Sequence, residues 1–118
     1  MKRAILARLA VLWVYGLVVV SLQPWRPKAF RHGGAAHDVP HFLAFFSAAL
    51  LLILIARSAR QRIYAPLAVV ALGLALEYAQ RLLYRGPFEW RDLANDACAA
   101  LFAFLLARRR PLREILVR

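Results

Sequence analysis

Four long runs of apolar residues follow one another along the chain, and short polar segments separate them. A helix of about 20 apolar residues is long enough to cross the hydrocarbon core of a bilayer. The runs therefore predict membrane-spanning helices over residues 4–22, 39–56, 63–83 and 93–107, within a single domain of residues 1–118. The second run becomes apolar only at Phe42, so we expect its helix to begin near Asp38 and to hold Pro40 in its first turn.

The composition supports a lipid environment. Of the 118 residues, 63% are hydrophobic and 19% are charged, whereas soluble domains are about half apolar and about a quarter charged. A chain this short cannot bury so much apolar surface in water. The sequence therefore predicts an all-α integral membrane four-helix bundle. The net charge of +11 would also fit a nucleic-acid-binding protein. The cations lie mostly at the ends of the apolar runs, however, so we expect no nucleic-acid partner.

The distribution of the cations predicts the orientation of the bundle. Cytoplasmic loops of membrane proteins carry an excess of lysine and arginine. One set of termini and loops holds 11 of the 17 cations, including Lys2, Arg57 and Arg108, and the opposite set holds 6, including Arg26 and Arg91. We therefore expect the N- and C-termini to be cytoplasmic.

Ionisable residues recur at a similar depth in three of the predicted spans. At 1.5 Å per residue, Glu77 lies about 21 Å into its span, and His41 and Asp96 lie about 24 Å and 18 Å from the cytoplasmic ends of theirs. All three are therefore expected in the outer leaflet. A charge inside hydrocarbon costs at least about 2.5 kcal/mol, so such residues turn inward and pair with one another.

Helical spacing places the polar residues on faces that we expect to meet. Because the connection between the third and fourth helices is short, these helices should be antiparallel neighbours. The expected partners of the carboxylates are Arg81, Arg85 and Arg91. The predicted ligand-binding site comprises Asp38, His41, Glu77, Gln80, Arg81, Arg85, Asp92, Asn95 and Asp96.

Three segments together resemble the VanZ-like family of small membrane proteins. They are Asp38-Val39-Pro40-His41-Phe42, then Glu77-Tyr78-Ala79-Gln80 with Arg85, then Asp92-Leu93-Ala94-Asn95-Asp96-Ala97. The resemblance covers residues 38–107 and rests on the order and spacing of the segments. This chain departs from the family pattern in having Asn95 three residues after Asp92, and alanines where glycines are usual in the last helix. The resemblance implies a role in the bacterial cell envelope, as a multipass protein of the cytoplasmic (inner) membrane, without implying a reaction.

A cluster of intramembrane ionisable residues predicts a functional site. We expect it to bind a cell-envelope lipid or a lipid-linked envelope precursor from the outer side, with the arginines facing its phosphate. One alternative is a membrane-embedded enzyme acting on such a head group, with His41 or Glu77 as general base and no catalytic residue assigned. The other is a structural partner of another membrane protein or of a second copy, with the polar residues holding the helices together.

A metal site is a weaker interpretation of the same residues. The spacing of His37 and His41 would permit both to ligate a metal with Asp38 and with Glu77 or Asp96. The pattern lacks the H-E-x-x-H signature, and Asp38 has a simpler role as a helix cap. We therefore expect no metal and no cofactor.

Small residues recur every four positions in the last span. Ala99, Ala103 and Ala107 form one row, and Ala94 and Cys98 form another. Rows of this kind let helix backbones approach closely, so we expect both to pack against other helices.

Overall fold

Four α-helices and no strand are found in residues 2–22, 35–84 and 90–108, the part of the chain that the computed structural model describes. For residues 35–38 and for Tyr84 it describes the backbone only. The helices are α1 (Lys2–Leu22), α2 (Ala35–Ile55), α3 (Ala59–Tyr84) and α4 (Trp90–Ala107). The all-helical prediction is confirmed for these residues. Each helix begins before the corresponding predicted span, because hydropathy marks the apolar part of a helix and not its polar first turns.

The start of α3 shows how a polar sequence begins a helix ahead of its apolar run. The hydroxyl oxygen of Ser58 accepts a hydrogen bond of 3.1 Å from the backbone N–H of Gln61. The side-chain oxygen of Gln61 in turn accepts one of 2.7 Å from the backbone N–H of Arg57. This reciprocal arrangement is close to a capping box, which satisfies N–H groups that have no partner within the helix. The cap fixes the start of α3 at Ala59, four residues before the predicted span.

The start of α2 corrects two expectations. The helix begins at Ala35, so Pro40 is its sixth residue and lies beyond the first turn. A proline at this position has no N–H to donate to the carbonyl four residues earlier, and the helix accommodates this loss without ending. Asp38 lies inside the helix and therefore does not cap it.

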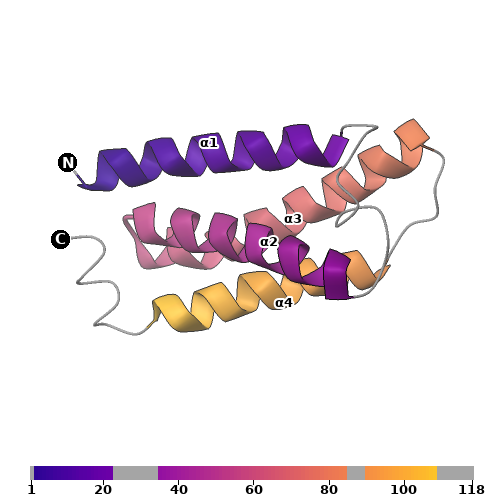
Figure 1. The fold of residues 1–118 in the computed structure, drawn as a ribbon. Helices are drawn as coiled ribbons and strands as arrows, with labels where there is room; N and C mark the ends of the chain where they lie inside the picture. Colours follow the sequence, from indigo (N-terminus) through magenta and orange to yellow (C-terminus); the bar gives the residue numbers. More distant parts are fainter. Residues whose placement is uncertain (1, 23–34, 85–89, 109–118) are drawn as a thin grey trace.

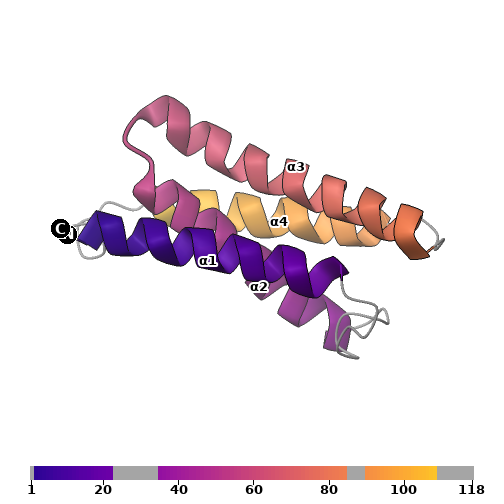
Figure 2. The same ribbon diagram turned by 90° about the horizontal axis from the view of Figure 1, so that it is seen from above.

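The helices run alternately up and down (Figures 1 and 2). The first residues of α1 and the last residues of α4 lie at one end of the bundle, and the end of α3 and the start of α4 lie at the other. Helix α4 packs against both α2 and α3, and α1 lies against α2 and α3. The predicted antiparallel pairing of α3 and α4 is confirmed. The extensive contact of α4 with α2 was not predicted.

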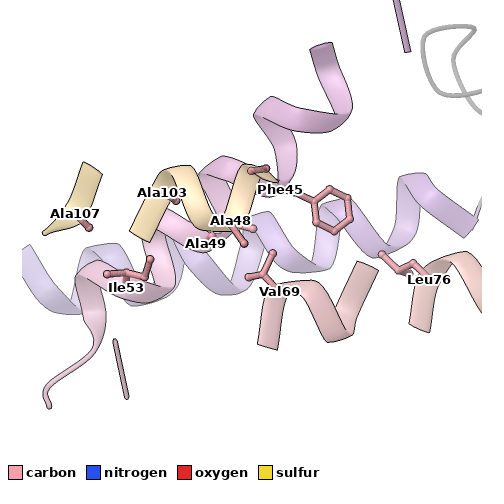
Figure 3. Packing of buried hydrophobic residues seen from close by; sticks show 10 residues of the cluster. Phe45, Ala48, Ala49, Ile53, Val69, Leu76, Ala103 and Ala107 are labelled. Carbon is pink, nitrogen blue, oxygen red and sulfur yellow. The ribbon is translucent and has the colours of Figure 1, made fainter. Parts of the chain in front are cut away.

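Alanines form much of the core between α2 and α4. Ala48 and Ala49 of α2 and Ala99 and Ala103 of α4 are fully buried, and Val69 of α3 packs onto them. Figure 3 shows Val69 pointing toward Ala48 and Ala49 across the interface. Small side chains bring helix backbones close together, which is typical of helix packing in membranes.

The two predicted rows of small residues have different outcomes. Ala99, Ala103 and Ala107 are all buried, as expected for close packing. Ala94 and Cys98 are exposed, so the prediction that this row packs against another helix is wrong. The rotation of α4 is set by its other face, which carries the buried carboxylates and the larger set of alanines.

Large apolar side chains cover the outside of the bundle. Val11, Tyr15 and Leu82 are each 69% exposed, and only one residue of α1, Ala10, is buried. Lys2–Leu22 and Ala59–Leu83 are long and apolar enough to cross a membrane, and the apolar part of α2, Val39–Ile55, is shorter. An apolar outer surface of this extent is unusual for a protein that folds alone in water.

Candidate functional site

Buried acidic groups gather at the end of the bundle where α3 ends and α4 begins. Among the described residues, the buried charged side chains are Glu77 of α3 and Asp92 and Asp96 of α4, which are 7%, 6% and 2% exposed. His41 of α2 joins them, with a side chain 14% exposed. Three helices therefore supply the polar cluster, which we define as His41, Glu77, Asp92 and Asp96.

His41 and Asp96 form the central contact of the polar cluster. Nε2 of His41 and Oδ1 of Asp96 form a hydrogen bond, and this contact joins α2 to α4. The imidazole ring also stacks on Phe45, one turn further along α2, with ring centroids 4.7 Å apart and an angle of 24° between the planes. The hydrogen bond on one side and the aromatic ring on the other fix the orientation of the imidazole.

Gly73 allows α3 to approach the Asp96 carboxylate. A Cβ atom placed on Gly73 would lie 3.0 Å from Cγ and 3.3 Å from Cβ of Asp96, and still nearer to Oδ2. Gly73 precedes Glu77 by four residues, so both occupy the same face of α3. The absence of a side chain at position 73 is therefore what lets the carboxylate lie between α2 and α3.

Two hydrogen bonds from side chains to backbone hold α1 beside the polar cluster. The Nε1–H of Trp13 donates to the carbonyl oxygen of Ala44 on α2 at 2.9 Å. The side-chain amide of Gln80 on α3 donates to the carbonyl oxygen of Ser21 at 2.8 Å. Both contacts lie in the half of α1 that is near the cluster, and they position this helix against α2 and α3.

A groove lies between α1 and α2 and has His41 in its wall. Its volume is about 410 Å³, and its walls are mostly apolar, with Leu12, Leu17 and Val20 on α1 and Phe45 on α2. His41 and Ser21 add polar atoms to the lining. The groove is thus apolar along most of its surface and polar where it meets the cluster.

The predicted site residues fall into three groups. The first group is the polar cluster, which brings together His41, Glu77, Asp92 and Asp96. Two further predicted residues, Gln80 and Asn95, are half-buried and follow or precede cluster members closely in the sequence. The side chains of Arg81 and of Arg91 are exposed. Arg85 lies outside the described residues, and the side chain of Asp38 lies outside them as well.

Asp96 forms a hydrogen bond with His41, a pairing that was not predicted, and the predicted pairing of the carboxylates with arginines stays a prediction. His41 lies between Asp96 and Phe45, and its imidazole can be neutral or charged. Glu77 and Asp92 also have interaction partners. The polar cluster is therefore a bonded network, with more carboxylates than cationic groups among its four members.

This chemistry suits a ligand that donates hydrogen bonds. Ionised carboxylates only accept hydrogen bonds, so hydroxyl, amine and amide groups are their natural partners. A histidine held by an aspartate is also the arrangement that orients an imidazole for proton transfer. The same network, if it has no ligand, would hold three helices together.

A metal-binding arrangement is not formed by the described residues. Across residues 2–22, 35–84 and 90–108 no group of three or more His, Cys, Asp or Glu side chains is placed to hold a metal ion. The side chain of His37, which the metal interpretation included, lies outside the described residues.

Sequence reasoning missed Gly73, Phe45 and Trp13. A signal existed for Gly73, since a glycine inside an apolar helix, one turn before a buried glutamate, indicates close backbone approach. Phe45 lies four residues after His41, the spacing of side chains that touch on one helix face. No signal in the sequence pairs Trp13 with Ala44, because the contact depends on how α1 is rotated.

Comparisons with known proteins give no relative for this fold or this polar cluster. No family profile, no curated protein and no solved structure matches this chain.

Proposed function

We propose that this chain is a multipass inner-membrane protein of the VanZ-like type, whose polar cluster binds the head group of a cell-envelope lipid in the outer leaflet. The observation that carries the proposal is the groove between α1 and α2, which is lined mostly by apolar side chains and has His41 of the polar cluster in its wall. A lipid has the same division between apolar chain and polar head.

The exposed surface supports membrane insertion of all four helices. Large apolar side chains are exposed on every helix, including Leu43 on α2 and Leu101 and Phe102 on α4. Helix α4 carries charges that lower its apolar character, but Asp92 and Asp96 are turned into the bundle and would not face lipid. Inward-facing, bonded carboxylates are the usual form of charge inside a membrane.

The orientation follows from the positions of the cations. Helix α1 begins at Lys2, and Arg57, Arg60 and Arg62 lie around the connection from α2 to α3, at the end of the bundle opposite the polar cluster. The positive-inside rule assigns this end to the cytoplasm. The polar cluster then lies in the outer half of the membrane, where envelope precursors are presented.

The acidic character of the polar cluster restricts the head group. Hydroxyl or amine groups of a glycan or amino sugar would donate hydrogen bonds to Glu77 and Asp92, whereas a phosphate placed among the carboxylates would be repelled. The exposed guanidinium groups of Arg81 and Arg91, near the end of α3 and the start of α4, are better placed to bind a phosphate at the rim.

Native mass spectrometry with lipid analysis of the detergent-purified protein tests this proposal. Gly16→Leu would fill the groove, because a Cβ at Gly16 meets nothing within 4 Å. Glu77→Gln would remove a charge from the cluster without changing its shape.

A defined lipid that is retained by wild type and lost in both variants supports the proposal. Tyr78→Phe, at an exposed neighbour of Glu77, is the matched control and should retain the lipid. The same lipid content in all four proteins would refute it, and the polar cluster would then serve helix packing.

A membrane-embedded enzyme is the second candidate, and the His41–Asp96 pair favours it. An imidazole oriented by a carboxylate and lining a groove could take a proton from a hydroxyl or water at the head group. The test is turnover of the lipid that co-purifies with the wild type. Loss of turnover in His41→Gln, with lipid binding and helical content retained, would support this candidate. Turnover at the wild-type rate in His41→Gln would exclude His41 as its base.

A further inference from the structure

A second pocket lies at the end of the bundle opposite the polar cluster, where α2 ends, α3 begins and α4 ends. Its volume is about 410 Å³. Ile53 comes from α2, Ala59, Arg62 and Ile63 from α3, and Phe104 and Arg108 from α4. No residue of the polar cluster lines it, so the two sites are separate.

Two arginines give this pocket its charge. Arg62 and Arg108 come from different helices and line the same pocket. The guanidinium carbon of Arg108 lies 5.8 Å from the centroid of the Phe104 ring, a cation–π distance that holds the side chain over the pocket wall. The described carboxylates lie elsewhere, since those with described side chains are the three members of the polar cluster. No carboxylate with a described side chain therefore lies beside the two arginines.

The rest of the pocket is apolar. Ile53, Ile63 and Phe104 line it beside the arginines, and Ala59 adds a small side chain that leaves room. A free phosphate would gain nothing from these residues, whereas an acyl chain would bury them. The pocket lies where the apolar stretches of α2 and α4 end. In a membrane-spanning helix this position is level with the phosphate groups of the lipids.

We propose that this pocket binds an anionic phospholipid, with Arg62 and Arg108 on its phosphate and its acyl chain against Ile63 and Phe104. The ligand belongs to the leaflet that faces the cytoplasm, which is the leaflet that attracts basic residues next to membrane helices. The inference depends on the bilayer location of the protein but not on the lipid proposed for the polar cluster. Either site can therefore fail its test while the other passes.

Native mass spectrometry of the full chain titrated with phosphatidylglycerol tests the proposal. We expect the Arg62→Gln/Arg108→Gln double variant to bind phosphatidylglycerol at least about tenfold more weakly than wild type, because each substitution removes a charge-assisted hydrogen bond to the phosphate. Helical content by circular dichroism should be unchanged, which shows that the variant is folded.

The matched control removes the same charge from outside the pocket. Arg57 and Arg60 are exposed beside the same connection and do not line the pocket, so Arg57→Gln/Arg60→Gln should bind within about twofold of wild type. Equal weakening in the two double variants would overturn the proposal, because it would show attraction to overall charge. Displacement of the lipid by an equal concentration of glycerol phosphate would also overturn it, because the apolar residues would then contribute nothing.

Discussion

Gly73 of α3 lies directly against the side chain of Asp96 on α4. A Cβ at Gly73 would lie 3.0 Å from Cγ of Asp96 and nearer still to Oδ2, which is closer than nearly all contacts of real Cβ atoms. Asp96 is also the hydrogen-bond partner of His41 on α2. The lack of a side chain at Gly73 thus lets α3 pack against the carboxylate that joins α2 to α4.

Gly73→Ala should destabilise the bundle. Overpacking of a close contact costs about 1–3 kcal/mol, and here it would push Asp96 away from His41. The measurement is the free energy of unfolding in mixed detergent. Gly16→Ala is the control, since a Cβ at Gly16 meets nothing within 4 Å, and it should be neutral or slightly stabilising. Equal stability of the two variants would contradict the close approach at Gly73.

His41 and Asp96 should behave as a coupled pair. Removing one member of a buried charged pair leaves the other without its partner and costs about 3–5 kcal/mol. His41→Phe and Asp96→Leu should each destabilise strongly, and the double variant should cost less than the sum of the two. The measurement is a double-mutant cycle of unfolding free energies. Additive effects would mean that the hydrogen bond between the two side chains contributes little.

The sequence predicts much of the fold but little of how the helices are rotated. Apolar runs identify the four helices, and a short connection identifies α3 and α4 as neighbours. The residue at which a helix starts depends on polar groups, as at α3, where the hydroxyl of Ser58 caps the helix. Hydropathy does not detect such a cap. Membership of His41, Glu77 and Asp96 in one site could be predicted from their common depth.

The pairing inside the site could not be predicted in the same way. Asp96 had candidate partners on several helices, and the choice of His41 depends on the rotation of α2 and on the space left by Gly73. Rotation also separates the two rows of small residues on α4, burying Ala103 and exposing Cys98. These relationships depend on how helices distant in sequence pack together. The spacing of residues along one helix carries no information about that packing.

The buried alanines of α4 should tolerate no enlargement. Ala103 is fully buried against α2, so Ala103→Leu should destabilise by about 1–3 kcal/mol or prevent α2 and α4 from packing. Ala94 is exposed on the same helix, and Ala94→Leu should change stability by less than about 0.5 kcal/mol. Unfolding in mixed detergent measures both. A large loss at Ala94 and none at Ala103 would mean that α4 is rotated differently.

The hydrogen bond from Trp13 to Ala44 should contribute measurably to the position of α1. Trp13→Phe removes the indole N–H and keeps an aromatic ring, so we expect a loss of about 0.5–1.5 kcal/mol in unfolding free energy. Tyr15→Phe is the control because Tyr15 is 69% exposed and lies on the same helix. A loss no larger than that of the control would show that α1 is held by apolar contacts and by the Gln80–Ser21 bond alone.

Cys98 offers a direct test of membrane insertion. It is the only cysteine of the chain and is exposed on the outer surface of α4, so in a bilayer its thiol should face acyl chains. We expect slow reaction with a charged maleimide in proteoliposomes, rapid reaction with an apolar maleimide, and rapid reaction with both after denaturation. Arg60→Cys in a Cys98→Ala background is the control, because residue 60 lies exposed at the start of α3 and should react with the charged reagent without denaturation. Rapid labelling of Cys98 by the charged maleimide in intact proteoliposomes would contradict insertion of α4, because a charged reagent enters hydrocarbon too slowly to reach a thiol among acyl chains.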